Sequence, residues 1–179
     1  MAIQPPPGFS IAPAVKGVLA SIEGVPTTVP FQFNPTEVTI DKPVPWQKHP
    51  GGVGNVPTLE FLGPEPRTLA CELLFDLLEA GGDVYATYIS KLETLTLVDG
   101  NLKRPPLCSF TWGSMLPVFK GVVEQLTTKY TMLLPDGTPC RATVSLRMRQ
   151  AGKLLNQSEA AAGTSRVTSS RSMPEAEES

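Results

Sequence analysis

"FKGVVEQLTTKYTMLLPDGTPCRATVSLRMRQ", residues 119–150, is the stretch that indicates the fold most clearly. Its two arms flank Pro135-Asp136-Gly137, a tripeptide with proline and glycine at their preferred turn positions. In the return arm the side chains alternate, so one face carries Ala142, Val144, Leu146 and Met148, and the other Arg141, Thr143, Ser145, Arg147 and Arg149. The first arm is expected to alternate likewise, one face carrying Val122, Glu124, Leu126, Thr128, Tyr130 and Met132. The stretch predicts an antiparallel hairpin with one apolar face and one face that is solvated or contacts a polar surface.

On the N-terminal side of this hairpin, five more segments have the pattern or composition of strands: 14–23, 27–33, 57–62, 67–76 and 107–112. Segment 67–76 alternates well, with Leu69, Cys71, Leu73 and Phe75 on one face. Gly-Pro-Glu-Pro at 63–66 is predicted to be a turn between two of these strands. The chain is therefore expected to be mainly antiparallel β.

One helix is predicted, from Asp83 to about Thr96. Asp83 suits the N-cap because its carboxylate can accept hydrogen bonds from the unpaired N–H groups of the first turn. Apolar side chains then recur at helical spacing, at Val84, Tyr88, Leu92 and Leu95. A helix of about 14 residues is marginal alone, so we expect it to dock on the rest of the protein.

Between two extended segments, "PFQFNPTEVTI" at 30–40 stops at Asn34-Pro35 and then resumes. Phe31 and Phe33 point to one side of a strand. Pro35 lacks an N–H for a ladder and keeps Asn34 out of the helical region. We interpret this pair as a corner that redirects a strand in the subunit.

The next segment, 42–56, holds three prolines and three glycines and is predicted to be a long irregular loop. Trp46 lies inside it. Such a tryptophan either folds back onto an edge of the core or packs on a neighbouring subunit.

The composition limits the classes of function that this chain can have. The 179 residues suffice for one domain, and the 19 prolines and 15 glycines favour extended structure over a helical bundle. A net charge of −2 gives no electrostatic reason to expect nucleic acid or an anionic membrane as partner. No apolar run is long enough to span a membrane, and no secretory signal opens the chain. We divide the chain into an N-terminal arm (1–13), a β domain (14–150) and a polar, disordered tail (151–179).

No residue pattern points to catalysis, a metal or a cofactor. The three cysteines are widely spaced and His49 is the single histidine, so we expect reduced, buried thiols in a cytosolic protein. "PGGVGN" at 50–55 lacks the lysine of a phosphate loop, and "TWGSMLP" at 111–117 is not a nucleophile elbow. Arg141, Arg147 and Arg149 form a stripe that suits a polar subunit interface or a solvated strand face. The protein is predicted not to be an enzyme.

Taken in order, several motifs resemble those of the tube-type domain of contractile injection systems, the phage-tail-like devices that include antifeeding prophage and Photorhabdus virulence cassettes. The resemblance runs from about residue 14 to 150. It rests on Phe-Asn-Pro at 33–35, Phe-Asp closing a strand at 75–76, Pro-Pro ahead of a strand that ends in Trp-Gly (105–113), and D-G-x-P-x-R-A at 136–142.

The resemblance implies a tube-subunit-like antiparallel β-barrel or sandwich with a packed helix. It implies a baseplate or tube-initiator component that sits between the spike hub and the inner tube and assembles as a ring, a hexamer. Such a protein is made in the bacterial cytoplasm and then becomes part of the particle. Candidate structural or interface residues are Phe33, Asn34, Pro35, Trp46, Trp112, Arg141, Arg147 and Arg149.

An alternative is a peptidoglycan-directed binding component of the same baseplate. Many proteins with this domain continue into a LysM module, but 151–179 is too short and too polar to be one. We therefore do not extend cell-wall binding through LysM to this chain.

Overall fold

The computed structural model describes residues 15–48, 57–113, 117–152 and 154. The predicted arm 1–13 and nearly all of the predicted tail 151–179 lie outside these residues. In chain order the elements are β1 (Val18–Ser21), β2 (Thr28–Pro30), β3 (Val38–Asp41), β4 (Trp46–Lys48), β5 (Leu59–Phe61), β6 (Thr68–Asp76), the π-helical turn η1 (Tyr85–Ile89), α1 (Ser90–Thr94), β7 (Cys108–Thr111), β8 (Phe119–Leu133) and β9 (Pro139–Gln150). The described residues are thus mainly β with one short helical segment, as predicted.

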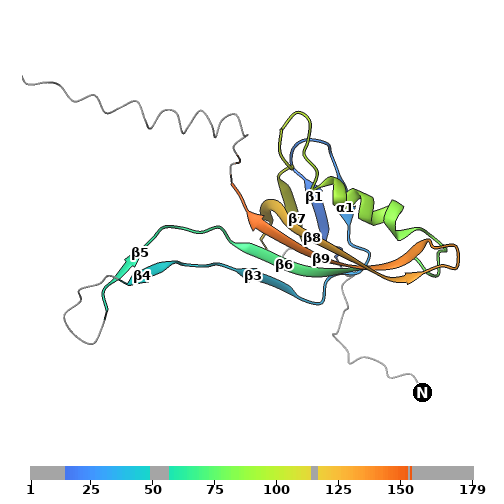
Figure 1. Ribbon diagram of the computed structural model, residues 1–179, viewed down its shortest axis with the longest axis horizontal. Coiled ribbons are helices and arrows are strands. Elements are labelled where there is room, and N and C mark those ends of the chain that lie inside the picture. Colours follow the sequence, from blue (N-terminus) through green and yellow to red (C-terminus); the bar gives the residue numbers. More distant parts are fainter. Residues whose placement is uncertain (1–14, 49–56, 114–116, 153, 155–179) are drawn as a thin grey trace, which may run out of the picture.

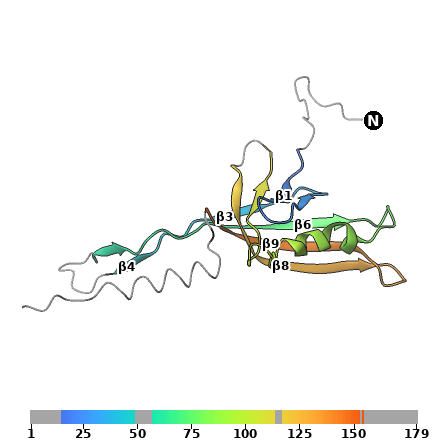
Figure 2. The same ribbon diagram turned by 90° about the horizontal axis from the view of Figure 1, so that it is seen from above.

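Most strands belong to one antiparallel sheet, whose order in the described residues is β2-β1-β7-β8-β9-β6-β3 (Figures 1 and 2). No hydrogen-bonded ladder joins its outer strands β2 and β3 in this part of the chain, so the expected closed barrel is not found there. The two outer strands are consecutive in the sequence, and the corner segment 31–37 runs between them.

The hairpin β8–β9 is the centre of the sheet. Leu126 lies opposite Leu146, Thr128 opposite Val144, and Tyr130 opposite Ala142, as the alternation predicts. The register shifts between Val123 and Gln125, which marks a bulge at Glu124.

The bulge corrects one prediction. The extra residue reverses which side chains face the core, so Phe119 and Val123 contact the core cluster before it and Leu126 contacts it after it. Val122 and Glu124 therefore do not share the core face with Leu126, Thr128 and Tyr130. A strict two-residue alternation cannot place an inserted residue.

The core lies between the curled sheet and the helical segment. As predicted, one face of β6 is buried through Leu69, Cys71, Leu73 and Phe75. The apolar residues of β9 lie beside them, and Phe31 meets Phe110 at a ring-centroid distance of 5.4 Å. Burial of this apolar surface is the main favourable contribution to folding.

The helical segment has the predicted place and cap. The N–H of Tyr85 donates to the Asp83 carboxylate at 2.8 Å. Val84, Leu92 and Leu95 are buried, and Tyr88 stacks on Phe75 at 4.6 Å. Two features of this segment were not predicted: its first turn is π-helical, and Ile89 is also buried.

A two-stranded arm is the largest departure from the predictions. β4 pairs with β5, and β3 pairs with β6, so the chain runs outward through β3 and β4 and returns through β5 and β6. Figures 1 and 2 show this arm projecting away from the sheet. The prediction of irregular structure throughout 42–56 is therefore wrong for Trp46–Lys48, and residues 49–56 lie outside the described part.

The predicted turn at 63–66 does not reverse the chain. This segment joins β5 to β6 in one continuous direction, although Gly63 has a φ of 132°. The two prolines there have no N–H to donate to a ladder, and the glycine weakens strand pairing, but none of them folds the chain back.

Candidate outer-face interface

The Asn34-Pro35 corner is held by two polar side chains that bind backbone on either side of it. Asn34 accepts a hydrogen bond from the N–H of Gly17 and donates one to the carbonyl of Val15, each at 2.9 Å. The Gln32 amide donates to the carbonyl of Asp76 at 2.5 Å and accepts from its N–H at 2.7 Å. These side chains bind the segment before β1 and the end of β6, between which no ladder runs in the described residues.

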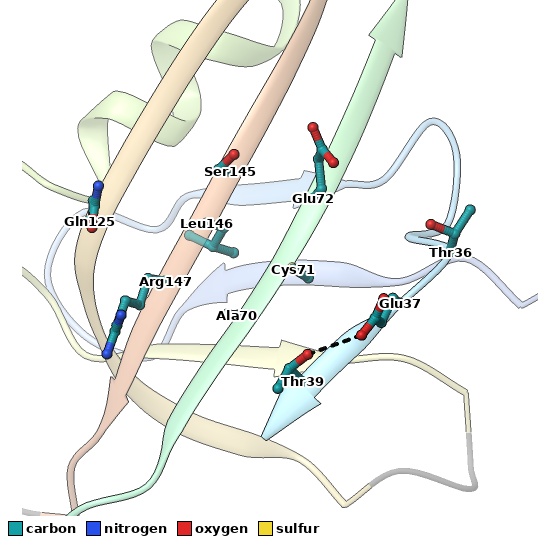
Figure 3. Close-up of a pocket in the computed structure, with 10 residues that line it drawn as sticks. All are labelled: Thr36, Glu37, Thr39, Ala70, Cys71, Glu72, Gln125, Ser145, Leu146 and Arg147. Carbon is teal, nitrogen blue, oxygen red and sulfur yellow. Dashed lines mark hydrogen bonds between the residues drawn. The ribbon is translucent and has the colours of Figure 1, made fainter. Parts of the chain in front are cut away.

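Beside this corner, an open trough follows the face of β6 and β9 that points away from the core. Its first part is a hollow of about 450 Å³, shown in Figure 3, where the hydroxyl of Thr39 donates to Glu37 at 3.4 Å. Its lining comes from β3, β6, β8 and β9 and the segment before β3: Thr36, Glu37, Thr39, Ala70, Cys71, Glu72, Gln125, Ser145, Leu146 and Arg147.

Two more hollows continue the trough. One of about 510 Å³ shares Thr36 and Glu72 with the first and is lined more by carbon, from Phe33, Pro35 and Leu74. The next, of about 230 Å³, shares Phe33 and reaches Asp76 and Arg141. The trough is therefore polar toward Arg147, apolar beside the corner and ionic at the end of β6. We call the middle part, lined by Phe33, Asn34, Pro35, Thr36, Glu72, Leu74 and Thr143, the apolar hollow.

The three arginines of the β9 stripe pair with two carboxylates on the neighbouring strands. The Asp76 carboxylate accepts from Arg141 Nε at 2.9 Å and Nη2 at 2.6 Å. Glu124 pairs with Arg147 at 3.4 Å and also with Arg149. The N–H of Leu78, followed by the Arg141 guanidinium, lowers the pKa of Asp76. Paired arginines of this kind suit a solvated or packed strand face better than a phosphate-binding stripe.

The structure brings together five of the eight residues proposed from the sequence. Phe33, Asn34 and Pro35 form one wall of the trough, and Arg141 and Arg147 come from its floor.

The other three predicted residues lie elsewhere. Trp112 is half-buried against the core, and Arg149 lies beyond the trough beside Glu124. Trp46 is on the arm, 56% exposed, with its ring 5.5 Å from that of Phe61. It does not fold back onto the core, so one of the two alternatives for this tryptophan is wrong.

Sequence reasoning missed Gln32, Glu72 and Leu74 as parts of this surface. Glu72 and Leu74 alternate with the buried residues of β6, and this alternation was the available signal for them. Gln32 lies after β2, where the predicted alternation is wrong, because Phe31 is buried whereas Phe33 is 47% exposed and lines the same hollow as Gln32. Nothing in the local sequence shows that the segments 32–36 and 72–76, about forty residues apart, meet at one trough.

The described residues contain no group of histidine, cysteine or acidic side chains that could hold a metal ion. The three cysteines are buried and unpaired. Burial raises the pKa of the Cys71 thiol to about 12, and burial, followed by the nearby Glu23 charge, raises that of Cys108 to about 11. In this part of the chain no helix has the length and apolar character needed to cross a bilayer.

The fold and the site together define a small β protein with an extended two-stranded arm and a trough along the face of β6 and β9 that points away from the core. A family model described as contractile injection system tube protein matches residues 20–159. The chain belongs to this family and is thus a component of a contractile injection system. A comparison with curated proteins finds no match.

Proposed function

We propose that this protein is the tube initiator or a baseplate subunit of its injection system, joining the spike hub to the inner tube. It would assemble in the bacterial cytoplasm as a ring, a hexamer, and then be carried in the particle. Its work would be structural, without a catalytic step. Membership of the tube family supports assembly, and the resemblance in motifs supports the initiator role.

One observation carries the ring proposal: besides the outer strand β2, the sheet has two edges without a ladder partner in the described residues, β3 and the distal half of β8. β3 is an outer strand, bonded to β6 on one side. β7 pairs with β8 at Phe119, Lys120 and Gly121, so from Val122 onward β8 has no ladder on that side in the described residues. Unpaired edges recruit further strands.

Between these edges lie β9 and β6, so the four strands β8-β9-β6-β3 form a block with one free edge at each end. If β3 of one copy pairs with the distal half of β8 of the next, every copy uses the same two different edges. Such a heterologous contact closes into a ring when the rotation fits. The barrel expected from the resemblance would then belong to the ring rather than to the single chain.

The test is to purify particles from a strain that lacks this subunit and to examine which parts remain. We expect purified particles from a deletion strain to keep the spike complex and lose the tube. Intact tubes would overturn the initiator role. Mass measurement of the isolated chain, with and without tube protein, should show a closed ring. If instead the chain binds purified peptidoglycan and forms no ring, the alternative baseplate function is favoured.

A further inference from the structure

The edge of β6 that faces the apolar hollow lacks a neighbouring strand. In the described residues β3 pairs with β6 only as far as Cys71, and the Gln32 side chain binds both backbone groups of Asp76. Successive residues of an antiparallel strand bind the neighbour on one side and then the neighbour on the other. Since Asp76 turns its N–H and C=O away from β9, Glu72 and Leu74 do so too. Their backbone groups therefore face the hollow, with no strand opposite them in the part of the chain that the structure describes.

The same place also exposes apolar side chains. Phe33 and Leu74 are 47 and 42% exposed, and together with Pro35 they line the hollow of about 510 Å³. A sheet edge with unpaired backbone groups readily takes up an added strand, and pockets beside it select the side chains of that strand. A short extended segment laid along β6 would satisfy the backbone of Glu72 and Leu74 and cover the apolar surface at once.

The described chain begins at the wall of this hollow. The carbonyl of Val15 accepts a hydrogen bond from the side chain of Asn34 at 2.9 Å, and Asn34 lines the hollow. The ammonium of Lys16 lies 5.9 Å from the centre of the Phe33 ring, which lines it too. Residues 1–14, which we call the N-terminal segment, therefore join the fold directly beside the hollow.

The N-terminal segment has the sequence of a short apolar strand. It carries no charged side chain. Residues 8–12, Gly-Phe-Ser-Ile-Ala, lie between Pro7 and Pro13, which limit a strand because they have no N–H for a ladder. Phe9 and Ile11 are two residues apart, so they share one face of an extended chain. They can therefore face the apolar side chains of the hollow while the backbone of 8–12 pairs with β6.

The N-terminal segment is long enough to reach the hollow of its own molecule. Ile11 and Phe9 precede Val15 by four and six residues, which at about 3.3 Å per residue allows roughly 13 and 20 Å of extended chain. A segment on so short a tether has an effective concentration on the order of millimolar. Its own hollow is therefore favoured over that of another copy.

The other end of the chain fits this place less well. β9 ends at the far end of β6, since Arg149 lies opposite Thr68. Thr143, which lines the hollow, is seven residues before the end of β9. Residues 155–179 would have to run back about 23 Å at 3.3 Å per residue. They also carry charged side chains, which are unfavourable in an apolar hollow.

We propose that residues 8–12 pair with the edge of β6 at Glu72 and Leu74, and that Phe9 and Ile11 cover the apolar hollow of the same molecule. The N-terminal segment thereby covers an edge that would otherwise be open to strands of other molecules. This contact lies within one molecule, so it does not depend on the ring of the proposed function.

The first experiment measures amide hydrogen exchange of β6 in the full-length chain, by mass spectrometry with fragmentation to single residues. The amides of Glu72 and Leu74 should exchange about tenfold faster in Phe9→Asp than in the unchanged chain, because hydrogen-bonded amides exchange only on opening. Ser10→Asp, which places the same charge on the opposite face of the segment, is the matched control and should keep the slow exchange. Equal exchange in Phe9→Asp and the unchanged chain would overturn the proposal.

Dilution distinguishes the hollow of the same molecule from that of another copy. The slow exchange at Glu72 and Leu74 should be unchanged across a concentration series, since a contact within one chain does not depend on concentration. Slow exchange that is lost on dilution would assign the hollow to a second copy and would also overturn the proposal.

The second experiment tests the contact with a disulfide. Leu74→Cys is combined in one chain with Phe9→Cys or with Ile11→Cys, and mild oxidation should close an internal disulfide in at least one of the two pairs. The natural cysteines are buried and should not compete. Leu74→Cys combined with Ser10→Cys is the control and should stay reduced. Disulfides that form only between chains, in neither pair, or equally fast from position 10 would each contradict the proposal.

These results separate this inference from the proposed function. An internal disulfide together with intact tubes in the deletion strain would support the N-terminal contact and reject the initiator role. Rings that assemble from a chain in which neither pair forms a disulfide would support the ring and reject the N-terminal contact.

Discussion

At the scale of single residues, Glu23 joins two loops that are far apart in the sequence. Its carboxylate accepts from Arg104 Nη1 at 2.5 Å and from the N–H of Leu107 at 3.1 Å. The Arg104 hydrogen bond, only partly opposed by burial, lowers the pKa of Glu23 below its ordinary 4.5. A carboxyl with a depressed pKa in the folded state binds its proton more weakly there than in the unfolded chain.

The sign of the pH dependence follows. The stabilisation by Glu23 should be complete above about pH 4.5 and should be lost as pH falls through the depressed pKa of the folded state. Glu23→Gln should cost about 1 kcal/mol at neutral pH, since the pair is partly exposed. Urea unfolding at pH 7 and at about pH 3.5 should show a smaller pH effect in this variant. The exposed Glu79→Gln serves as control; the same pH effect in Glu23→Gln and wild type would contradict the prediction.

Thiol chemistry gives a second residue-scale prediction. With a pKa of about 12, about one Cys71 thiol in ten thousand is ionised at pH 8, whereas an unperturbed cysteine is ionised to roughly a quarter. Iodoacetamide should therefore label Cys71 and Cys108 at least a hundredfold more slowly in native than in guanidinium-unfolded protein. Peptide mapping by mass spectrometry measures both rates. Similar rates in the two states would mean that these residues are not in a closed core.

At the scale of elements, the contact between β8 and β9 depends on Gly121. A Cβ added there would overlap the backbone carbonyl oxygen of Arg149, and backbone cannot move aside as a side chain can. Gly121→Ala should therefore destabilise the protein by about 1–3 kcal/mol, as overpacking usually does.

The matched control is Gly100→Ala, where a Cβ meets nothing within 4 Å. It should be neutral or slightly stabilising, because alanine reduces the entropy of the unfolded chain. Chemical denaturation of both variants gives the comparison. A neutral Gly121→Ala would show that β8 and β9 lie further apart than this structure places them.

The elements themselves were predictable to the extent that their patterns are local. Alternation identified β6 and β9, and the Asp83 cap with its apolar stripe identified the helical segment. The bulge at Glu124 and the pairing of β4 with β5 were not predictable this way. An inserted residue leaves no period in the sequence, and the three residues of β4 are too few, among prolines, to show one.

At the scale of the whole molecule, Pro35 tests whether the corner serves assembly. It is buried at the apolar hollow and follows Asn34, whose side chain anchors the corner. Pro35→Val frees φ at this point and should reduce assembly about tenfold, with little change in soluble monomer.

Pro26→Val, at an exposed position in the loop after β1, is the control and should assemble normally. Size-exclusion chromatography with light scattering measures both the monomer yield and the assembled fraction. Normal assembly by Pro35→Val would refute the idea that the corner shapes an interface.

The sequence by itself determined the class of the protein: a mainly antiparallel β chain with one docked helix, and the motifs of an injection-system tube domain. It did so because strand alternation, turn residues and a helix cap are local properties. Only the tertiary structure decided that Gln32 and Asn34 bind backbone at the end of β6 and before β1, that five candidate residues meet at one trough, and that Trp46 projects on an arm. These arrangements depend on which distant segments pack together, and that choice is made by burial of the shared core rather than by any single stretch.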